Sequence, residues 1–98
     1  MMIYVSIGNS DDKLTQAEWA AFVADTETAI GQGVEHWHGK WFTAPDSAWQ
    51  GACWAFEIRE FASHTARARL REVAKHFQQD AIAWAEAQTE FISGGQQA

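Results

Sequence analysis

The sequence predicts a single α+β domain of the ferredoxin-like class, with a β-α-β-β-α-β order and two helices on one face of an antiparallel sheet. Three observations support this prediction. The chain has 98 residues, 47% hydrophobic and 20% charged, which is typical of one globular domain. Four short runs have the apolar pattern of strands, and two longer ones have helical spacing. Turn residues separate the runs, and we assign the domain to residues 1–93 and a flexible tail to 94–98.

The first two elements have strong local signals. In MIYVSIG every second residue is apolar, which predicts a strand that Gly8 and Asn9 end. In LTQAEWAAFVADTETAI, Thr15 and Glu18 form a capping box that predicts a helix start. Apolar residues then recur at helical spacing until GQG at 31–33, which predicts the helix end.

A hairpin is expected next. VEHWHGKWF (34–42) and ACWAFEI (52–58) are both rich in the aromatic and β-branched residues that strands favour. Pro45, Asp46 and Gly51 lie between them, which predicts a loop that joins two antiparallel strands.

The second half of the chain holds one helix and one ambiguous run. SHTARARLREVAKHFQQ (63–79) carries one apolar stripe at helical spacing, with its arginines on the outer face. The alanines of DAIAWAEAQTEFI favour a helix, whereas the alternation from Ala81 to Phe91 favours a strand. We expect a strand over 81–92, with a helix as the alternative.

Alternation along the strands assigns side chains to the two faces of the sheet. Trp37 and Trp41 are expected to pack beneath the helices. The other face is open unless a partner covers it, and its mixture of polar and aromatic groups suits a ligand pocket or a wet dimer interface. One bulge in the second strand would exchange the faces, so the register stays undecided. The side chains expected on the open face are Tyr4, Ser6, His36, His38, Cys53, Glu57, Trp84 and Glu86.

His36 and His38 form an H-x-H pair, a spacing that zinc sites use because both imidazoles can bind one ion. Two ligands do not make a site, and Cys53, Glu57 or Glu86 would have to supply the third. We therefore expect no metal and no cofactor, and the two histidines are the residues to test for metal. Cys53 is the single cysteine, so the chain forms no internal disulfide.

The charge is acidic overall but uneven along the chain. Thirteen acidic against seven basic residues give a net charge of −6, which argues against a general nucleic-acid-binding protein. Four basic residues in the second predicted helix are interpreted first as a solvated face, and otherwise as a contact for an anion or an acidic partner. These four are Arg67, Arg69, Arg71 and Lys75.

The expected location is the cytoplasm of a bacterial cell or of a phage-infected host. The N-terminal stretch MMIYVSIGNSDD has neither the basic region nor the apolar stretch of a signal peptide. No run approaches the roughly 18 apolar residues of a membrane-spanning helix, so no membrane partner is expected.

Several short motifs together resemble a known group of proteins. The opening strand, LTQAEWAAFVAD, the glycine-tryptophan strand with HGKW, and VAKHFQQDAIAW resemble a family of small uncharacterised bacterial proteins with a ferredoxin-like fold. The pattern is also similar to short accessory reading frames of actinobacteria and their phages. It runs from Ile3 to Ile92, and Trp49 and Cys53 have no counterpart in it. The resemblance implies a fold and a homodimer, and it implies no activity and no catalytic residue.

Three classes of function follow from these observations. The first is a non-catalytic binding protein, homodimeric, that takes a small ligand or a protein partner on the open face. Six Trp and six Phe are more aromatic residues than a small core holds, which favours this class. The second is a cofactor-independent enzyme of the dimeric α/β-barrel type that uses His, Tyr or Glu as acid and base. The third is an anion or nucleic-acid contact through the basic second helix.

Overall fold

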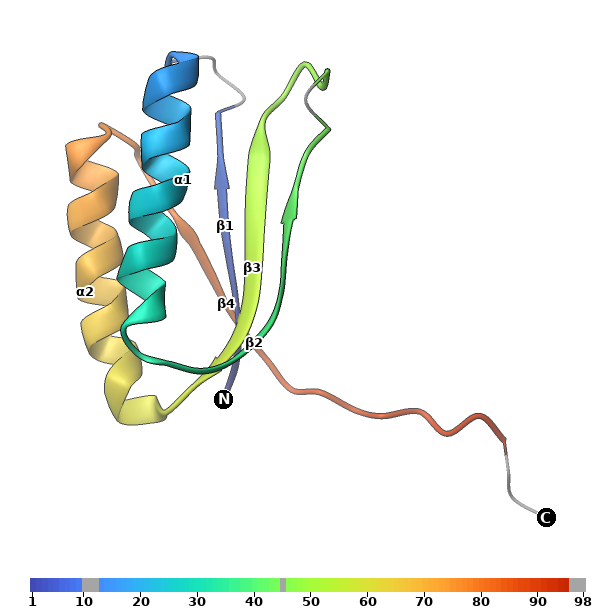
Figure 1. Ribbon diagram of the computed structural model, residues 1–98. Helices are drawn as coiled ribbons and strands as arrows, with labels where there is room; N and C mark the ends of the chain where they lie inside the picture. Colours follow the sequence, from blue (N-terminus) through green and yellow to red (C-terminus); the bar gives the residue numbers. More distant parts are fainter. Residues whose placement is uncertain (10–12, 45, 96–98) are drawn as a thin grey trace.

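The computed structural model describes residues 1–9, 13–44 and 46–95, and it has the expected order of elements (Figure 1). Pro45 and the last three residues of the expected tail lie outside this part of the chain. The elements are β1 (Met2–Gly8), α1 (Gln16–Gly31), β2 (Val34–Phe42), β3 (Gly51–Ile58), α2 (Glu60–His76) and β4 (Ala83–Ala87).

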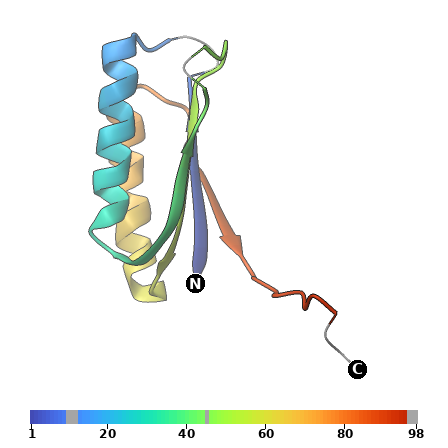
Figure 2. The same cartoon turned by 45° about the vertical axis from the view of Figure 1, so that its right-hand side comes forward.

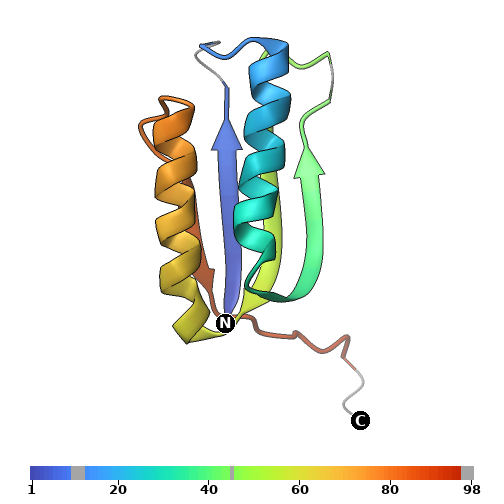
Figure 3. The ribbon, with the colours of Figure 1, turned by 60° about the vertical axis from the view of Figure 1, so that its left-hand side comes forward.

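The four strands form one antiparallel sheet in the order β2-β3-β1-β4. Both helices lie on the same face of this sheet, and the opposite face is uncovered (Figure 2). Figure 3 shows α2 in front of the β4 side and α1 nearer to β3 and β2. The predicted α+β class, with an antiparallel sheet and two helices, is therefore confirmed.

The core lies between the helices and the sheet. Every second residue of β1 and of β3 is buried there, because successive side chains of a strand point to opposite faces. The amphipathic sides of the two helices close the core from above. Its fully buried large side chains are Ile3, Val5, Phe22, Ile30, Trp54, Phe56 and Ile58.

Local hydrogen bonds explain where α1 begins. The Glu18 N–H donates to Thr15 Oγ1 at 3.2 Å, and the Thr15 N–H donates to Glu18 Oε1 at 2.9 Å, so the predicted capping box is present. The bond from the Thr15 backbone lowers the pKa of Glu18. Asn9 is buried just before this turn, where its side chain bonds both backbone groups of Leu14 and the amide of Gln50. Asn9 thus joins the end of β1 to the start of α1 and to the β2–β3 connection.

A shared carboxylate ties the middle of α1 to the sheet. Glu27 Oε1 accepts a hydrogen bond from Lys40 Nζ at 2.7 Å and another from Trp54 Nε1 at 2.9 Å. These two bonds, the one from Lys40 foremost, hold the pKa of Glu27 below its usual range. The indole of Trp54 is fully buried, so Glu27 satisfies a donor that water cannot reach.

The last strand is shorter than expected. The strand interpretation of the final run is correct, but pairing with β1 ends at Ala87 rather than near Phe91. Residues 88–95, here called the C-terminal segment, leave the sheet and project away from the body of the domain (Figure 1). Phe91 and Ile92 on this segment are 92% and 88% exposed.

Candidate functional site: the open face of the sheet

Two irregularities in β2 decide which of its side chains reach the open face. The pairing with β3 shifts between Val34 and His36 and again between Trp37 and Gly39. Trp37 therefore lies on the helix side, where its ring is 5.7 Å from that of Phe56. The expectation that Trp41 also packs beneath the helices is wrong. After the second shift Trp41 points to the open face and is 55% exposed.

The open face is built from three rows of side chains that cross the four strands. Each row contains one residue from every strand, and the rows are defined by the pairing of the strands. Read from the β2 edge to the β4 edge, the rows are His36, Glu57, Met2 and Ala87; then Gly39, Ala55, Tyr4 and Ala85; then Trp41, Cys53, Ser6 and Ala83.

Side-chain size changes systematically across these rows. The β4 edge presents an alanine in each row, whereas Trp41 and His36 stand at the β2 edge. Gly39 is small for a local reason, because a Cβ at this position would lie 3.1 Å from the Trp41 ring. The indole of Trp41 therefore lies across Gly39 and raises the β2 side of the face.

The polar residues of the face include a histidine–carboxylate pair. His38 Nε2 lies 2.8 Å from Glu57 Oε2, and since a carboxylate only accepts, the imidazole donates its N–H. The rings of His36 and His38 meet edge-on at 4.6 Å between centroids. Within the described ranges, no group of three or more His, Cys, Asp and Glu side chains is placed to hold a metal ion.

Two residues expected on the open face lie on the other side. β1 pairs Val5 with Trp84 and Ile3 with Glu86, and since Ile3 and Val5 face the helices, so do Trp84 and Glu86. Trp84 contacts Phe56 at 6.1 Å between ring centroids, and Glu86 forms an ion pair with Arg67. Because a shift of one position in a strand exchanges its two faces, the expected positions of Trp84 and Glu86 were wrong together.

The open face carries very little charge. Among its described residues Glu57 is the single carboxylate, and none is a lysine or an arginine. The whole chain, in contrast, is 20% charged. Cys53 is half-buried on this face between Trp41 and Ser6. The other residues that were expected on this face and do lie on it are Tyr4, Ser6, His36, His38 and Glu57. A face that is poor in charge and exposes two large aromatic rings, Tyr4 and Trp41, shares these two features with the centre of a protein interface.

The basic residues of α2 do not form one patch. Arg67 is paired with Glu86, and its guanidinium stacks 5.1 Å from the Trp84 ring centre. Arg69 lines a groove of about 310 Å³ between the helices. Arg71 and Lys75 line a different groove, of about 430 Å³, between α2 and β4. The four residues predicted as one anion contact are thus divided between two surfaces.

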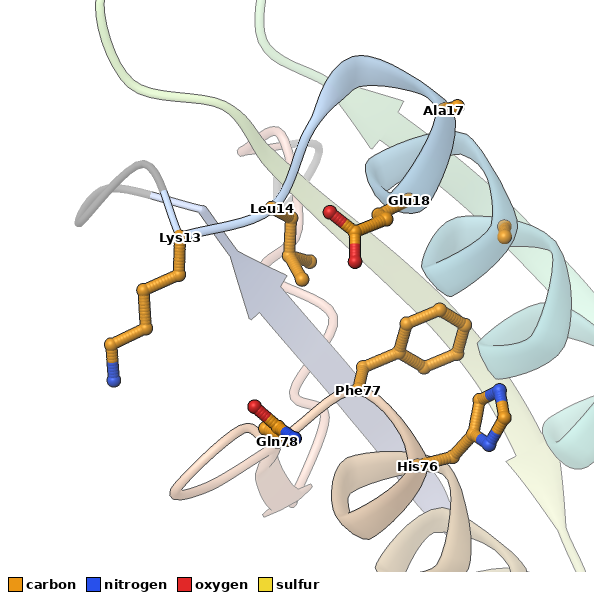
Figure 4. Close-up of a pocket in the computed structure, with 8 residues that line it drawn as sticks. Lys13, Leu14, Ala17, Glu18, His76, Phe77 and Gln78 are labelled. Carbon is orange, nitrogen blue, oxygen red and sulfur yellow. The ribbon is translucent and has the colours of Figure 1, made fainter.

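A third groove, of about 420 Å³, lies where α1 begins and α2 ends (Figure 4). Phe77 forms its inner wall and stacks on Phe22 at 5.1 Å, and His76 lies beside it. The carboxylate of Glu18 borders the groove but is engaged by Thr15 in the helix cap. These contacts explain the groove as part of the helix–helix packing.

Comparison with known proteins adds no relative to this description. Neither a scan against protein-family models nor a search of curated proteins finds a match for the chain. In the part of the chain that the structure describes, no helix is long and apolar enough to cross a membrane. The evidence for a function therefore lies in the geometry of the faces and grooves.

Proposed function

We propose that this chain is a non-catalytic binding protein that acts as a homodimer, with the open sheet faces of two copies packed against each other. The observation that carries the proposal is the composition of that face. It is poor in charge, it exposes Trp41 and Tyr4, and each of its rows ends in an alanine at the β4 edge. Depletion of charge and enrichment in aromatic rings are the features of an interface core.

The rows also favour one arrangement of the two copies. A two-fold axis parallel to the strands reverses every row, so that large side chains of one copy lie over small ones of the other. Trp41, whose ring also covers Gly39, then lies over Ala83 and Ala85 of the second copy. An axis perpendicular to the strands would instead place Tyr4 over Tyr4 and leave the alanines facing each other. Both arrangements keep the strands of the two sheets nearly aligned, as face-to-face packing requires, so the fit of large over small side chains decides for the first.

The size of the face indicates that it is not the whole interface. Four strands about 4.8 Å apart and three rows about 6.6 Å apart cover roughly 400 Å² in plan. A standard interface buries about 800 Å² on each partner. The projecting C-terminal segment offers further apolar surface through Phe91 and Ile92, so we include it in the proposed contact.

The proposal is tested by measuring the molar mass of the wild type and of two designed variants by sedimentation velocity. Ala85 is exposed in the middle row of the open face, so Ala85→Arg leaves the protomer intact and places a charge inside the proposed interface. Ala20→Arg is the matched control, because Ala20 is exposed on α1, on the other side of the sheet. We expect a dimer for the wild type and for Ala20→Arg, and a monomer for Ala85→Arg. A wild type that is monomeric at 100 µM, a concentration of about one hundred times a micromolar Kd, rejects the proposal.

The ferredoxin-like class is part of the same proposal. Its support is that β1 and β2 run in the same direction on either side of β3, as do β3 and β4 on either side of β1. Each pair is joined through one helix, which makes two interleaved β-α-β units.

A further inference from the structure

The groove between α2 and β4 has the properties of a small-molecule site. Its volume of about 430 Å³ is within the range of ligand pockets. One wall is apolar and includes the ring of Trp84, while the C-terminal half of α2 contributes cations. The lining residues are Arg67, Leu70, Arg71, Ala74, Lys75, Gln79, Asp80, Ala81, Ile82 and Trp84.

Two residues of this lining carry buried donors without an acceptor. The Trp84 Nε1–H and the Arg67 Nε–H are inaccessible to solvent and bond to no atom of the described chain. Leaving a buried donor unpaired costs about 1–3 kcal/mol, so such groups are rare in folded proteins. Both residues line the same groove, so their two N–H groups can report on a molecule that binds there.

The charge of the lining is opposite to that of the chain. Three cations and one carboxylate line the groove, although the chain carries −6 overall. Arg67 is neutralised by Glu86, so the charge for a ligand comes from Arg71 and Lys75. Lys75 has only a 3.7 Å contact with Glu72, in which both side chains are about three-quarters exposed. Contacts of this kind contribute little and yield readily to a ligand.

We propose that this groove binds a small organic anion, with its apolar body against Trp84 and Ile82 and its carboxylate or phosphate at Arg71 and Lys75. The single carboxylate of the lining, Asp80, limits how far the negative charge of the ligand can extend toward the loop after α2, because it repels an anion there. The site is independent of the proposed dimer, since Trp84 and α2 lie on the opposite side of the sheet from the open face.

The experiment is an NMR titration of the full chain with four defined probes. Phenyl phosphate and benzoate carry both an aromatic body and an anion, inorganic phosphate carries the anion alone, and benzyl alcohol carries the body alone. The readouts are the Trp84 indole N–H, assigned among the six tryptophans with Trp84→Phe, and the Arg67 Nε–H. We expect both signals to shift saturably with the two aromatic anions, and at least tenfold weaker binding of the other two probes. The tighter of phenyl phosphate and benzoate identifies phosphate esters or carboxylates as the class.

Matched variants distinguish binding in this groove from general electrostatic attraction of an anion to the basic residues of α2. Arg71→Gln and Lys75→Gln should each weaken binding of the tighter aromatic anion at least fivefold. Arg69→Gln is the control, since Arg69 is two positions from Arg71 but lines the groove on the other side of α2. Equal losses for Arg69→Gln and Arg71→Gln, or inorganic phosphate binding as tightly as phenyl phosphate, would overturn the proposal. Ala85→Arg should bind the anion as the wild type does, so a failed dimer and a failed groove are distinguishable.

Discussion

The carboxylate of Glu27 offers the sharpest test of how α1 is held on the sheet. Glu27→Ala removes the acceptor of the Trp54 N–H, which is buried with a fully inaccessible side chain. An orphaned buried donor costs about 1–3 kcal/mol. The lost contact with Lys40 is half exposed and adds about 0.2–1 kcal/mol. We therefore expect Glu27→Ala to lower the free energy of unfolding by about 1–4 kcal/mol.

Two further variants divide this loss between its causes. Glu27→Gln keeps an oxygen for Trp54 and should lose only about 1 kcal/mol, because a hydrogen bond to a charged group becomes a neutral one. Lys40→Met removes only the exposed pair and should cost about 0.2–1 kcal/mol. The assay is urea unfolding followed by circular dichroism, at one protein concentration because a dimer makes stability concentration-dependent. If Glu27→Ala loses no more stability than Lys40→Met, the bond from Trp54 to Glu27 does not stabilise the fold.

Three other predictions concern the pH dependence of the Glu27 contacts and two parts of the proposed dimer interface. Because the pKa of Glu27 is lowered in the folded state, its ionised carboxylate stabilises the fold fully above the unfolded-state pKa of about 4.3. This stabilisation is lost as the pH falls through the folded-state pKa. The urea midpoints of the wild type and of Glu27→Gln should therefore converge in acid. Phe91→Ser with Ile92→Ser should weaken the dimer in sedimentation equilibrium while leaving the amide spectrum of the domain unchanged; an unaltered Kd would remove the C-terminal segment from the interface. Gly39→Ala should push the Trp41 indole aside by a few tenths of an ångström, because the new Cβ would lie 3.1 Å from its ring, and should weaken dimerisation measurably in sedimentation equilibrium; unchanged affinity would exclude Trp41 from the contact.

Elements with strong local signals could be predicted from the sequence. The capping box at Thr15 and Glu18 predicted the start of α1 to within a residue, because both partners of the two hydrogen bonds lie within one turn. The strand β1 was equally accessible, since Ile3, Val5 and Ile7 alternate without interruption.

The faces of β2 were predictable only as far as His38. His36 and His38 do lie on the open face and Trp37 on the helix side, as the alternation indicated. After the second shift the odd-numbered side chains point to the open face instead of the helix side, so Trp41 lies on the open face. A bulge is a matter of pairing with β3, and nothing in VEHWHGKWF alone indicates where the extra residue falls.

The orientation of β4 depended on distant contacts in the same way. Its alanines and its Trp84 and Glu86 form two alternating sets, and either set could face the helices. The choice is made by α2, because Arg67 stacks on Trp84 and pairs with Glu86. The alanine edge of the open face and the groove beside α2 both follow from this choice, and neither was visible in the sequence. Anion contact was foreseen for four basic residues, but only the folded chain separates Arg71 and Lys75 from Arg69.

In the proposed dimer two open faces pack with their rows reversed. An isotope-filtered NOE experiment on a mixture of labelled and unlabelled chains reports contacts between copies alone and therefore detects this packing. We expect NOEs from the Trp41 ring of one copy to the methyl groups of Ala83 and Ala85 of the other. NOEs from the Trp41 ring to the His36 ring of the other copy, which an axis perpendicular to the strands would produce, or the absence of any contact between copies, would rule this arrangement out.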